Sequence, residues 1–215
     1  MIFNRHLELA GKHAPLSPSK YYWMADDEEG FFKRWVSSYM AQVGTILHDE
    51  ARKHIEYGIK AKKSDKNNLI IALLEGGIPR GVVNDIDMDI CLANFMNYTN
   101  DSIGFMMEPE VCLKYSEDCF GHADAVGYDE KERILRINDM KTGSTPVHIE
   151  QLLGYAGLFC LEYKVDPRSL KQCELRIYQL GDVIYHTPDA EELNAIVQTI
   201  MRKDELIKVF KRGGV

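Results

Sequence analysis

Residues 124–141 have the sequence DAVGYDEKERILRINDMK, which is the pattern of a tight β-hairpin with a charged tip. Fourteen residues separate Asp124 from Asp139. A symmetric hairpin therefore pairs these two residues across its strands. Lys141 then lies on the same face as Asp139, because side chains alternate between faces with a period of two. Two carboxylates and an ammonium at one end of a hairpin predict a site that binds a divalent metal and polarises a phosphate.

The two faces of this hairpin differ in polarity. The face that carries both aspartates also carries the larger apolar side chains, namely Val126, Tyr128, Leu135 and Ile137. The opposite face is more polar and carries Ala125, Gly127, Ile134, Arg136 and Asn138. A carboxylate on a face that meets the core is costly unless it is paired or coordinates a metal. Two alternatives stay open: a solvated hairpin end with a surface salt bridge to Lys141, and a one-residue register slip that separates the aspartates.

The chain has 215 residues, of which 45% are hydrophobic and 27% charged, values typical of a soluble globular protein. This length favours one domain with a sizeable core. No apolar segment approaches the roughly 20 residues that span a bilayer, and the first residues lack the pattern of a signal peptide. Five cysteines without a Cys-x-x-Cys pair argue against a disulfide framework or a zinc knuckle. We therefore expect no membrane association and a cytoplasmic location, in the host cytoplasm if the protein is viral.

The net charge of −7 argues against a protein that coats nucleic acid by charge alone. It does not exclude an enzyme that acts on nucleic acid through a metal, because carboxylates held for metal binding add negative charge and a bound metal reverses the local sign. We interpret two lysine-rich runs, at residues 60–66 and 203–212, as solvated surface rather than as DNA contacts.

Apolar spacing and turn residues predict the order of the elements. Apolar positions three and four residues apart predict a long helix from about residue 31 to 58. Around it we expect a short helix from Ser17-Pro18, a loop at 60–68, a short helix or strand at 69–74, a helix at 84–97 and a loop at 97–104. Three strands follow at about 108–115, 119–128 and 132–141, then a helix at 146–163, strands at 173–180 and 183–186, and a helix at 188–210.

This order predicts a single α/β or α+β domain over residues 1–215. Its parts are a mainly helical portion at 1–105, a sheet core with the hairpin and one helix at 106–187, and a C-terminal helix at 188–215. Residues 67–105 match no motif that the sequence assigns.

Three further side chains complete the constellation around the hairpin. Gln151 and Tyr155 are four residues apart and share one face of the predicted helix, which begins only about four residues after Lys141. His48 lies in the middle of the long predicted helix. Taken alone, the histidine fits a packed or hydrogen-bonded imidazole, and the Gln-x-x-x-Tyr pair fits ordinary surface chemistry. Their order along the chain is the informative feature.

That order resembles the RecB-type branch of the PD-(D/E)XK nuclease superfamily over roughly residues 40–180. The motifs that carry the resemblance are Gly44…His48, Gly121-His122-Ala123-Asp124, Asp139-Met140-Lys141-Thr142-Gly143 and Gln151-Leu152-Leu153-Gly154-Tyr155-Ala156. The resemblance implies a restriction-endonuclease-like core. In such a core a central mixed sheet with a three-strand antiparallel meander is flanked by helices, here with an N-terminal helical elaboration.

The resemblance also implies a role for each residue at the hairpin end. Asp124 and Asp139 would bind the metal, with His48 and the backbone carbonyl of Met140 as further ligands. Lys141 would orient or activate the attacking water and stabilise charge on the phosphate. The second acidic position is an aspartate where glutamate is commoner in the family, which shortens the reach of the carboxylate by one methylene.

Three supporting residues follow from the same resemblance. Gln151 and Tyr155 would support the site or contact the DNA backbone. Glu110 begins a predicted strand where many relatives carry an acidic residue; the alternative is an exposed glutamate at a strand end.

The cofactor expectation follows from the donor atoms. Oxygen ligands with one imidazole suit one or two Mg²⁺ or Mn²⁺ ions. Some relatives hold an iron–sulfur cluster with four cysteines. Here Cys160 and Cys173 are thirteen residues apart and no partner cysteines flank the core, so no iron–sulfur cluster is expected.

The resemblance implies hydrolysis of DNA phosphodiester bonds, with an exonuclease of DNA recombination, repair or phage replication as the favoured activity. The expected partners are single- or double-stranded DNA and a protein of recombination or replication. Three alternatives stay open: a structure-specific or single-strand endonuclease of the same fold, a non-cleaving DNA-binding or regulatory module, and a metal-independent protein whose long helices form an oligomer interface.

Overall fold

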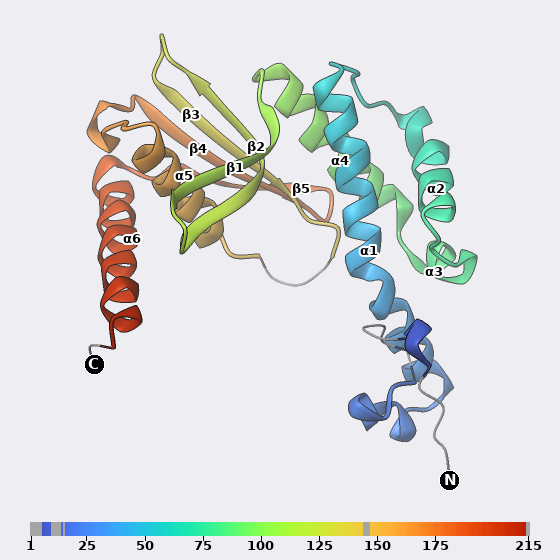
Figure 1. Ribbon diagram of the computed structural model, residues 1–215. Helices are drawn as coiled ribbons and strands as arrows, with labels where there is room; N and C mark the ends of the chain where they lie inside the picture. Colours follow the sequence, from blue (N-terminus) through green and yellow to red (C-terminus); the bar gives the residue numbers. More distant parts are fainter. Residues whose placement is uncertain (1–5, 10–13, 15, 144–146, 214–215) are drawn as a thin grey trace.

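The predicted hairpin is present in the computed structural model, which describes residues 6–9, 14, 16–143 and 147–213 (Figure 1). Strand β2 (Cys119–Asp129) pairs antiparallel with β3 (Ile134–Met140). Val126 lies opposite Ile137 and Tyr128 opposite Leu135, so the symmetric register is confirmed. The pairing ends at Ala125 and Asn138, one residue short of Asp124 and Asp139.

Within the described residues, five strands form one mixed sheet in the order β1-β2-β3-β4-β5. The edge strand β1 (Glu108–Ser116) is antiparallel to β2, and β4 (Gln172–Gln179) is parallel to β3. Helix α5 (Glu150–Glu162) connects β3 to β4, as a parallel pair requires. The second edge strand, β5 (Asp182–His186), is antiparallel to β4. The chain is thus an α+β structure, and the three strands before α5 form the expected antiparallel meander.

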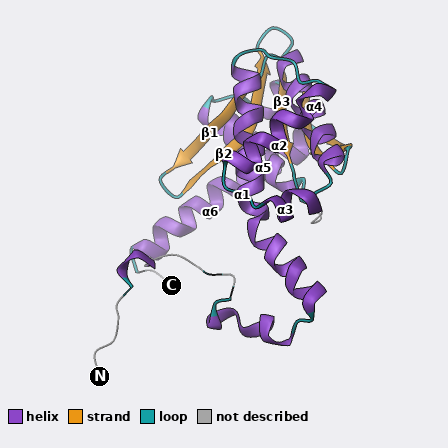
Figure 2. Cartoon of the chain, turned by 90° about the vertical axis from the view of Figure 1, so that its right-hand side faces the viewer, coloured by secondary structure: helices purple, strands orange, loops and turns teal. Residues whose placement is uncertain are grey.

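Helices cover both faces of this sheet. Helices α5 and α6 (Ala190–Lys211) pack on one face, where Leu135, Ile137 and Leu152 are buried. Helices α1 (Glu28–Glu56) and α4 (Met88–Gly104) cover the other face, with α2 (Lys66–Glu75) and α3 (Arg80–Asp85) beyond them (Figure 1). In the view of Figure 2, α1 to α4 lie in front of the strands. Among the described residues, no helix has the length and apolarity needed to span a membrane.

Both faces of the hairpin are buried, although the sequence indicated one apolar and one more polar face. Val126, Leu135 and Ile137 enter the core beneath α5 and α6, as their pattern predicted. Asn138, on the opposite face, is also fully buried, and its side-chain amide donates to Ser102 Oγ of α4 at 3.1 Å. A polar side chain can line a buried face when a helix supplies its hydrogen-bond partner.

Helix α1 confirms the long helix predicted from apolar spacing. Its buried residues recur every four or seven positions, at Val36, Val43, Leu47, Ala51 and Ile55. The helix begins after Asp27, whose carboxylate accepts a hydrogen bond from Gly30 N at 2.8 Å. The first turns of α1 extend beyond the sheet (Figures 1 and 2). The short helix predicted from Ser17-Pro18 precedes them as a 3₁₀ helix over Pro18–Ala25, which is kinked at Lys20.

The loop predicted at residues 97–104 is wrong, because these residues form the last turns of α4. Polar residues of low helix propensity suggested a loop, but their side chains find partners in the fold. Asn100 exchanges hydrogen bonds with the backbone of Ala61, and Ser102 accepts one from Asn138. Tertiary contacts override weak local propensity here. The helix expected at 84–97 is likewise two helices, α3 and α4.

Two other predicted boundaries differ from the structure. The segment 60–68, predicted as a loop, contains a 3₁₀ turn at Lys63–Asp65 and the beginning of α2. Helix α5 begins at Glu150, and the start predicted at Pro146 lies outside the described residues. The strands predicted at 173–180 and 183–186 and the last helix agree with β4, β5 and α6 to within about two residues.

Candidate metal centre

Asp124 connects three elements of the fold. One carboxylate oxygen, Oδ2, accepts a hydrogen bond from the backbone N–H of Met140 on β3 at 3.0 Å. The same oxygen lies 3.3 Å from Nδ1 of His48 on α1. The structure therefore brings His48 from the predicted helix to the predicted strand, across 76 positions of sequence.

Glu110 lies opposite Asp124 on the neighbouring strand. In the β1–β2 register, Pro109 pairs with Ala125 and Val111 with Ala123, so Glu110 falls across from Asp124. Its carboxylate, the His48 ring and the Asp124 carboxylate each offer a ligand atom, and these atoms lie within 4.8 Å of one another. Its side chain is exposed near the beginning of β1, as the alternative of an exposed strand-end glutamate predicts, and it also lies within reach of the other two side chains.

The backbones of β1 and β2 are irregular around Glu110 and Asp124. Glu110 has a φ of +53°, in the left-handed region that side-chain-bearing residues rarely adopt. On β2, Ala123 packs into the core beneath α5 and α6, whereas Ala125, two residues later, packs into the core beneath α1 and α4. Regular alternation would place both on one face. Irregular strand backbone of this kind re-aims side chains and recurs beside functional sites.

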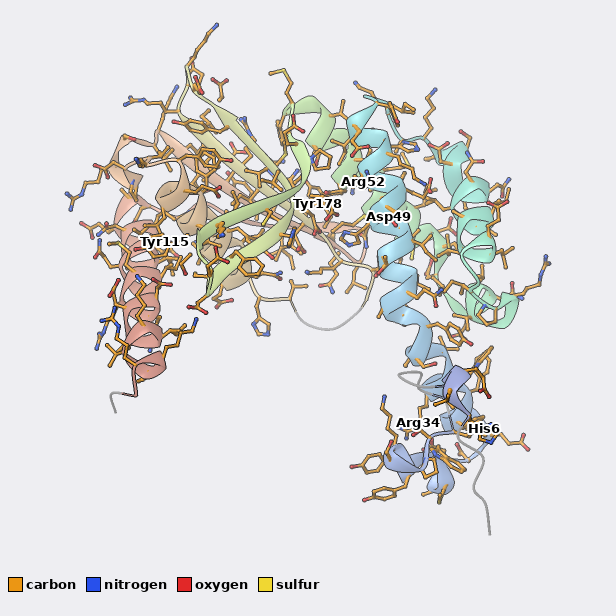
Figure 3. All side chains as sticks on the ribbon, in the orientation of Figure 1. His6, Arg34, Asp49, Arg52, Tyr115 and Tyr178 are labelled. Carbon is orange, nitrogen blue, oxygen red and sulfur yellow. The ribbon has the colours of Figure 1, made fainter. Side chains whose placement is uncertain are left out.

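The side chains of His48, Glu110 and Asp124 line an open cavity of about 550 Å³. Arg52 and Asp49, which extend from the same part of α1 (Figure 3), lie at its border. Arg52 forms ion pairs with Glu56 at 2.7 Å and with Asp49 at 3.9 Å. The lining of the cavity therefore combines carboxylates with one guanidinium group.

Asp139 and Lys141 form a second charged pair beside this cluster. Lys141 Nζ lies 2.9 Å from both carboxylate oxygens of Asp139, which is only 3% exposed. The contact to Oδ1 has hydrogen-bond geometry, whereas Oδ2 has no hydrogen-bond partner among the described residues. Asp139 is not part of the compact set formed by His48, Glu110 and Asp124. The predicted pair of aspartates is thus present, but Asp139 contacts the lysine.

Gln151 and Tyr155 of α5 extend the polar contacts of the Asp139–Lys141 pair. Gln151 Oε1 lies 3.4 Å from Lys141 Nζ, and Gln151 Nε2 donates to the Tyr155 hydroxyl at 3.3 Å. A Cβ atom at Gly121 would lie 2.8 Å from the Tyr155 ring, so only glycine lets the ring approach β2 this closely. The four side chains Asp139, Lys141, Gln151 and Tyr155 form one continuous polar chain, and the motif glycine makes room for its last member.

Gly44 has a similar role on α1. A Cβ atom there would lie 3.2 Å from Thr142 Oγ1, in the segment that follows β3. Glycine thus allows α1 to pass close to the Asp139–Gly143 motif. His48, one turn later on the helix, is brought to Asp124 by this close approach.

The Met140 carbonyl, predicted as a ligand, lies on the side of β3 that faces Asp124. The N–H of Met140 donates to Asp124, and the N–H and C=O of one strand residue point to the same side of the strand. The neighbouring Lys141 N–H donates to the Tyr178 carbonyl on β4 at 2.9 Å, as expected for the opposite side.

Burial raises the pKa of Asp124 to about 6, and the negative charge of Asp139 adds to this rise. The neighbouring His48, the Met140 N–H and Lys141 act in the opposite direction. Burial is the larger effect because the carboxylate loses its water while its compensation is incomplete. A cation bound next to this carboxylate would therefore stabilise its ionised form.

Asn94 on α4 is a supporting residue that the sequence did not indicate. Its Nδ2 donates to the Lys141 carbonyl at 3.0 Å, and its Oδ1 accepts from Gly181 N at 2.7 Å. The side chain is 2% exposed. Asn94 therefore ties the backbone of Lys141 to the β4–β5 turn. No local pattern marks it, because its two partners lie 47 and 87 residues away.

We expect Asn94→Ala to lower the free energy of unfolding by about 1–3 kcal/mol, because it leaves the Lys141 carbonyl and the Gly181 N–H without their partner. Urea unfolding monitored by circular dichroism measures this change. Asn97→Ala is the matched control, since Asn97 is exposed and makes only a 3.5 Å contact to the Gly181 carbonyl. Equal destabilisation by both substitutions would contradict the assigned role of Asn94.

Tyr98, also on α4, lies beneath the acidic groups. Its side chain is buried and packs edge-on against Tyr178, with ring centroids 5.7 Å apart. Burial, followed by the negative charges of Asp124, Glu110 and Asp139, raises its pKa well above the usual value. Segment 67–105, which matched no motif in the sequence, thus supplies both Tyr98, which is buried near the acidic groups, and Asn94, which holds the backbone of Lys141.

Comparisons of this chain with protein-family models, with curated proteins and with solved structures find no match.

Proposed function

We propose that this protein is a metal-dependent deoxyribonuclease with a restriction-endonuclease-like core, and that it acts as an exonuclease. The observation that supports this best is the convergence of His48, Glu110 and Asp124, from three elements, to within 4.8 Å beside the Asp139–Lys141 pair. The antiparallel meander followed by a helical crossover to a parallel strand is consistent with the proposed core. The choice of exonuclease rests on the family resemblance of the motifs.

The donor set fits magnesium or manganese. Two carboxylates and one imidazole offer hard oxygen atoms and a single nitrogen, a combination that Mg²⁺ tolerates and Mn²⁺ accepts well. The buried Asp139 Oδ2, which lacks a hydrogen-bond partner among the described residues, offers a further oxygen. When bound, such a metal lowers the pKa of a water molecule and neutralises charge on a phosphate. The expectation that the protein holds no iron–sulfur cluster stays a prediction.

Lys141 and the residues that position it supply the other groups needed for phosphodiester hydrolysis. Lys141, held between Asp139 and Gln151, presents an ammonium that can donate hydrogen bonds to a phosphate oxygen and to the attacking water. Gln151 and Tyr155 fix the direction of this lysine. Because Asn94 and the Tyr178 carbonyl fix the backbone of Lys141, the ammonium is preorganised rather than mobile.

The proposed partners and location follow from this function. The substrate is single- or double-stranded DNA, and a protein of recombination or replication is the proposed macromolecular partner. A role in recombination, repair or phage replication and a cytoplasmic location belong to the same proposal.

Digestion of end-labelled single- and double-stranded DNA with manganese tests this function. Wild-type protein is expected to release nucleotides from the ends, and Lys141→Ala to slow the release by about 10²–10³-fold, the usual effect of removing one donor that stabilises developing charge. Lys131→Ala, at the exposed hairpin tip, is the matched control and should retain the wild-type rate.

Two outcomes would replace the proposal by an alternative. Cleavage of covalently closed circular DNA would make the enzyme an endonuclease of the same fold. DNA binding without manganese-dependent cleavage would make it a binding or regulatory module.

A further inference from the structure

The two edges of the sheet are built differently. Strand β1 carries several features that prevent pairing with another strand. Pro109 lacks an N–H, Glu110 has a left-handed backbone, Lys114 places a charge on the strand, and the register shifts between Lys114 and Ser116. Proteins use proline, lysine and irregular backbone to block edge-to-edge association.

Strand β5 lacks these features. Its sequence, Asp182-Val183-Ile184-Tyr185-His186, contains neither proline nor lysine, and its pairing with β4 is regular throughout. The three central side chains are apolar or aromatic and 41–50% exposed. A regular, exposed and hydrophobic edge is a template for a further strand.

The turn before β5 determines which of its backbone groups are available. Leu180 and Gly181 both have positive φ, +54° and +83°, and they form a two-residue turn of the hairpin type. Gln179 and Asp182 close this turn as a hydrogen-bonded pair. Because hydrogen bonding alternates along a strand, the N–H and C=O groups of Val183 and Tyr185 point away from β4, toward the open edge.

We propose that two copies of this chain associate through β5, antiparallel and centred on Ile184. In this register Val183 of one copy lies opposite Tyr185 of the other, and both residues present their outward backbone groups. Four hydrogen bonds then join the two strands, and the two sheets become continuous. The proposal is independent of the nuclease function.

The same register makes the side chains complementary. Ile184 meets Ile184 of the second copy at the symmetry axis, and Asp182 of each copy lies across from His186 of the other. A carboxylate directly across from an imidazole can accept a hydrogen bond from the ring, and the two form an ion pair when the ring is protonated. His186 already contacts the Glu192 carboxylate of α6 at 3.0 Å, so a carboxylate from the second copy approaches a ring held in place. A register centred on Val183 would instead place Tyr185 opposite Gly181 and separate Asp182 from His186.

Light scattering over a concentration series tests the association. Wild-type protein is expected to form dimers as its concentration rises. Ile184→Lys should remain monomeric, because two ammonium groups would meet at the axis. Ile71→Lys, a matched change at an exposed isoleucine of α2, should associate like the wild type. A wild-type protein that stays monomeric at every concentration, or an Ile184→Lys variant that still dimerises, would overturn the proposal.

Disulfide crosslinking tests the register. Ile184→Cys, made in a chain with Cys112→Ser and Cys119→Ser, should crosslink under mild oxidation. The two facing residues form a non-hydrogen-bonded pair with Cα atoms about 4.5 Å apart, which suits a disulfide. Val183→Cys in the same background is the control, since its two copies lie on opposite sides of the axis. Crosslinking of both variants at equal rates would refute this register.

Discussion

Replacement of Asp139 by alanine is expected to lower the rate of manganese-dependent DNA cleavage by about 10³-fold, or on the order of 4 kcal/mol of transition-state stabilisation. Asp139 is the buried partner of Lys141, and its Oδ2, 2.9 Å from Lys141 Nζ, has no hydrogen-bond partner among the described residues. Its removal takes away an oxygen proposed to bind the metal and also releases the ammonium from its position. Single-turnover cleavage of end-labelled DNA measures the chemical step directly.

Two further variants make this result specific. Asp139→Asn keeps the size of the side chain but loses its charge, and it should be nearly as slow as the alanine variant. Glu130→Ala, at the exposed hairpin tip, removes a carboxylate far from the cluster and should cleave at the wild-type rate. Unchanged thermal unfolding of the Asp139 variants would show that they fold. Wild-type activity in a folded Asp139→Asn variant would remove Asp139 from the active site.

Asp124→Asn is expected to stabilise the metal-free protein by about 2–3 kcal/mol at neutral pH. Burial raises the pKa of Asp124 from 3.8 to about 6, so the ionised carboxylate is less stable in the folded state than in the unfolded chain. A neutral amide of the same shape avoids that cost and can still accept the Met140 hydrogen bond. Urea unfolding in the presence of a chelator measures the difference.

The size of this effect depends on pH. Well below the unfolded pKa of 3.8 the carboxyl is protonated in both states, so wild type and variant should be equally stable. As the pH rises from about 4 to 6, the unfolded chain releases its proton first, and the wild type loses stability relative to the variant. Above about pH 6 the difference should stay constant. A difference that grows as the pH falls would contradict the raised pKa.

Added manganese should reverse the order of stability. An ion that binds only the folded state stabilises it by mass action, and the wild type should gain more than the variant because it retains the carboxylate. The melting temperature of the wild type should therefore rise with manganese concentration, and that of Asp124→Asn should rise much less. Equal increases in both proteins would place metal binding elsewhere.

Local patterns determined the hairpin and most of the elements. The register of β2 and β3 follows from the tip sequence and the two-residue alternation, both of which lie within residues 124–139. The same locality explains α1, whose buried apolar positions recur at helical spacing from Val36 to Ile55. Where the chain's own pattern was weak, as at residues 97–104, contacts such as Asn100 with Ala61 determined the helix instead.

The candidate site was identified only in part from sequence. His48, Asp124, Asp139, Lys141, Gln151 and Tyr155 were selected by the order of motifs, and the structure brings them to one end of the hairpin. The grouping of Glu110 with His48 depends on a left-handed backbone within a strand, which glutamate does not signal. Asn94 and Tyr98 had no signal, because both act through residues distant in sequence.

The sequence alone predicted the hairpin register that brings Asp124, Asp139 and Lys141 to one end of the hairpin, because alternation and turn length act over neighbouring residues. Only the tertiary structure decided which partners the two aspartates contact. Asp124 joins His48 and Glu110, whereas Asp139 turns to Lys141. That division depends on how closely α1 passes β3 at Gly44 and on the bend of β1 at Glu110. Both are packing contacts between distant segments, whose geometry no local pattern specifies.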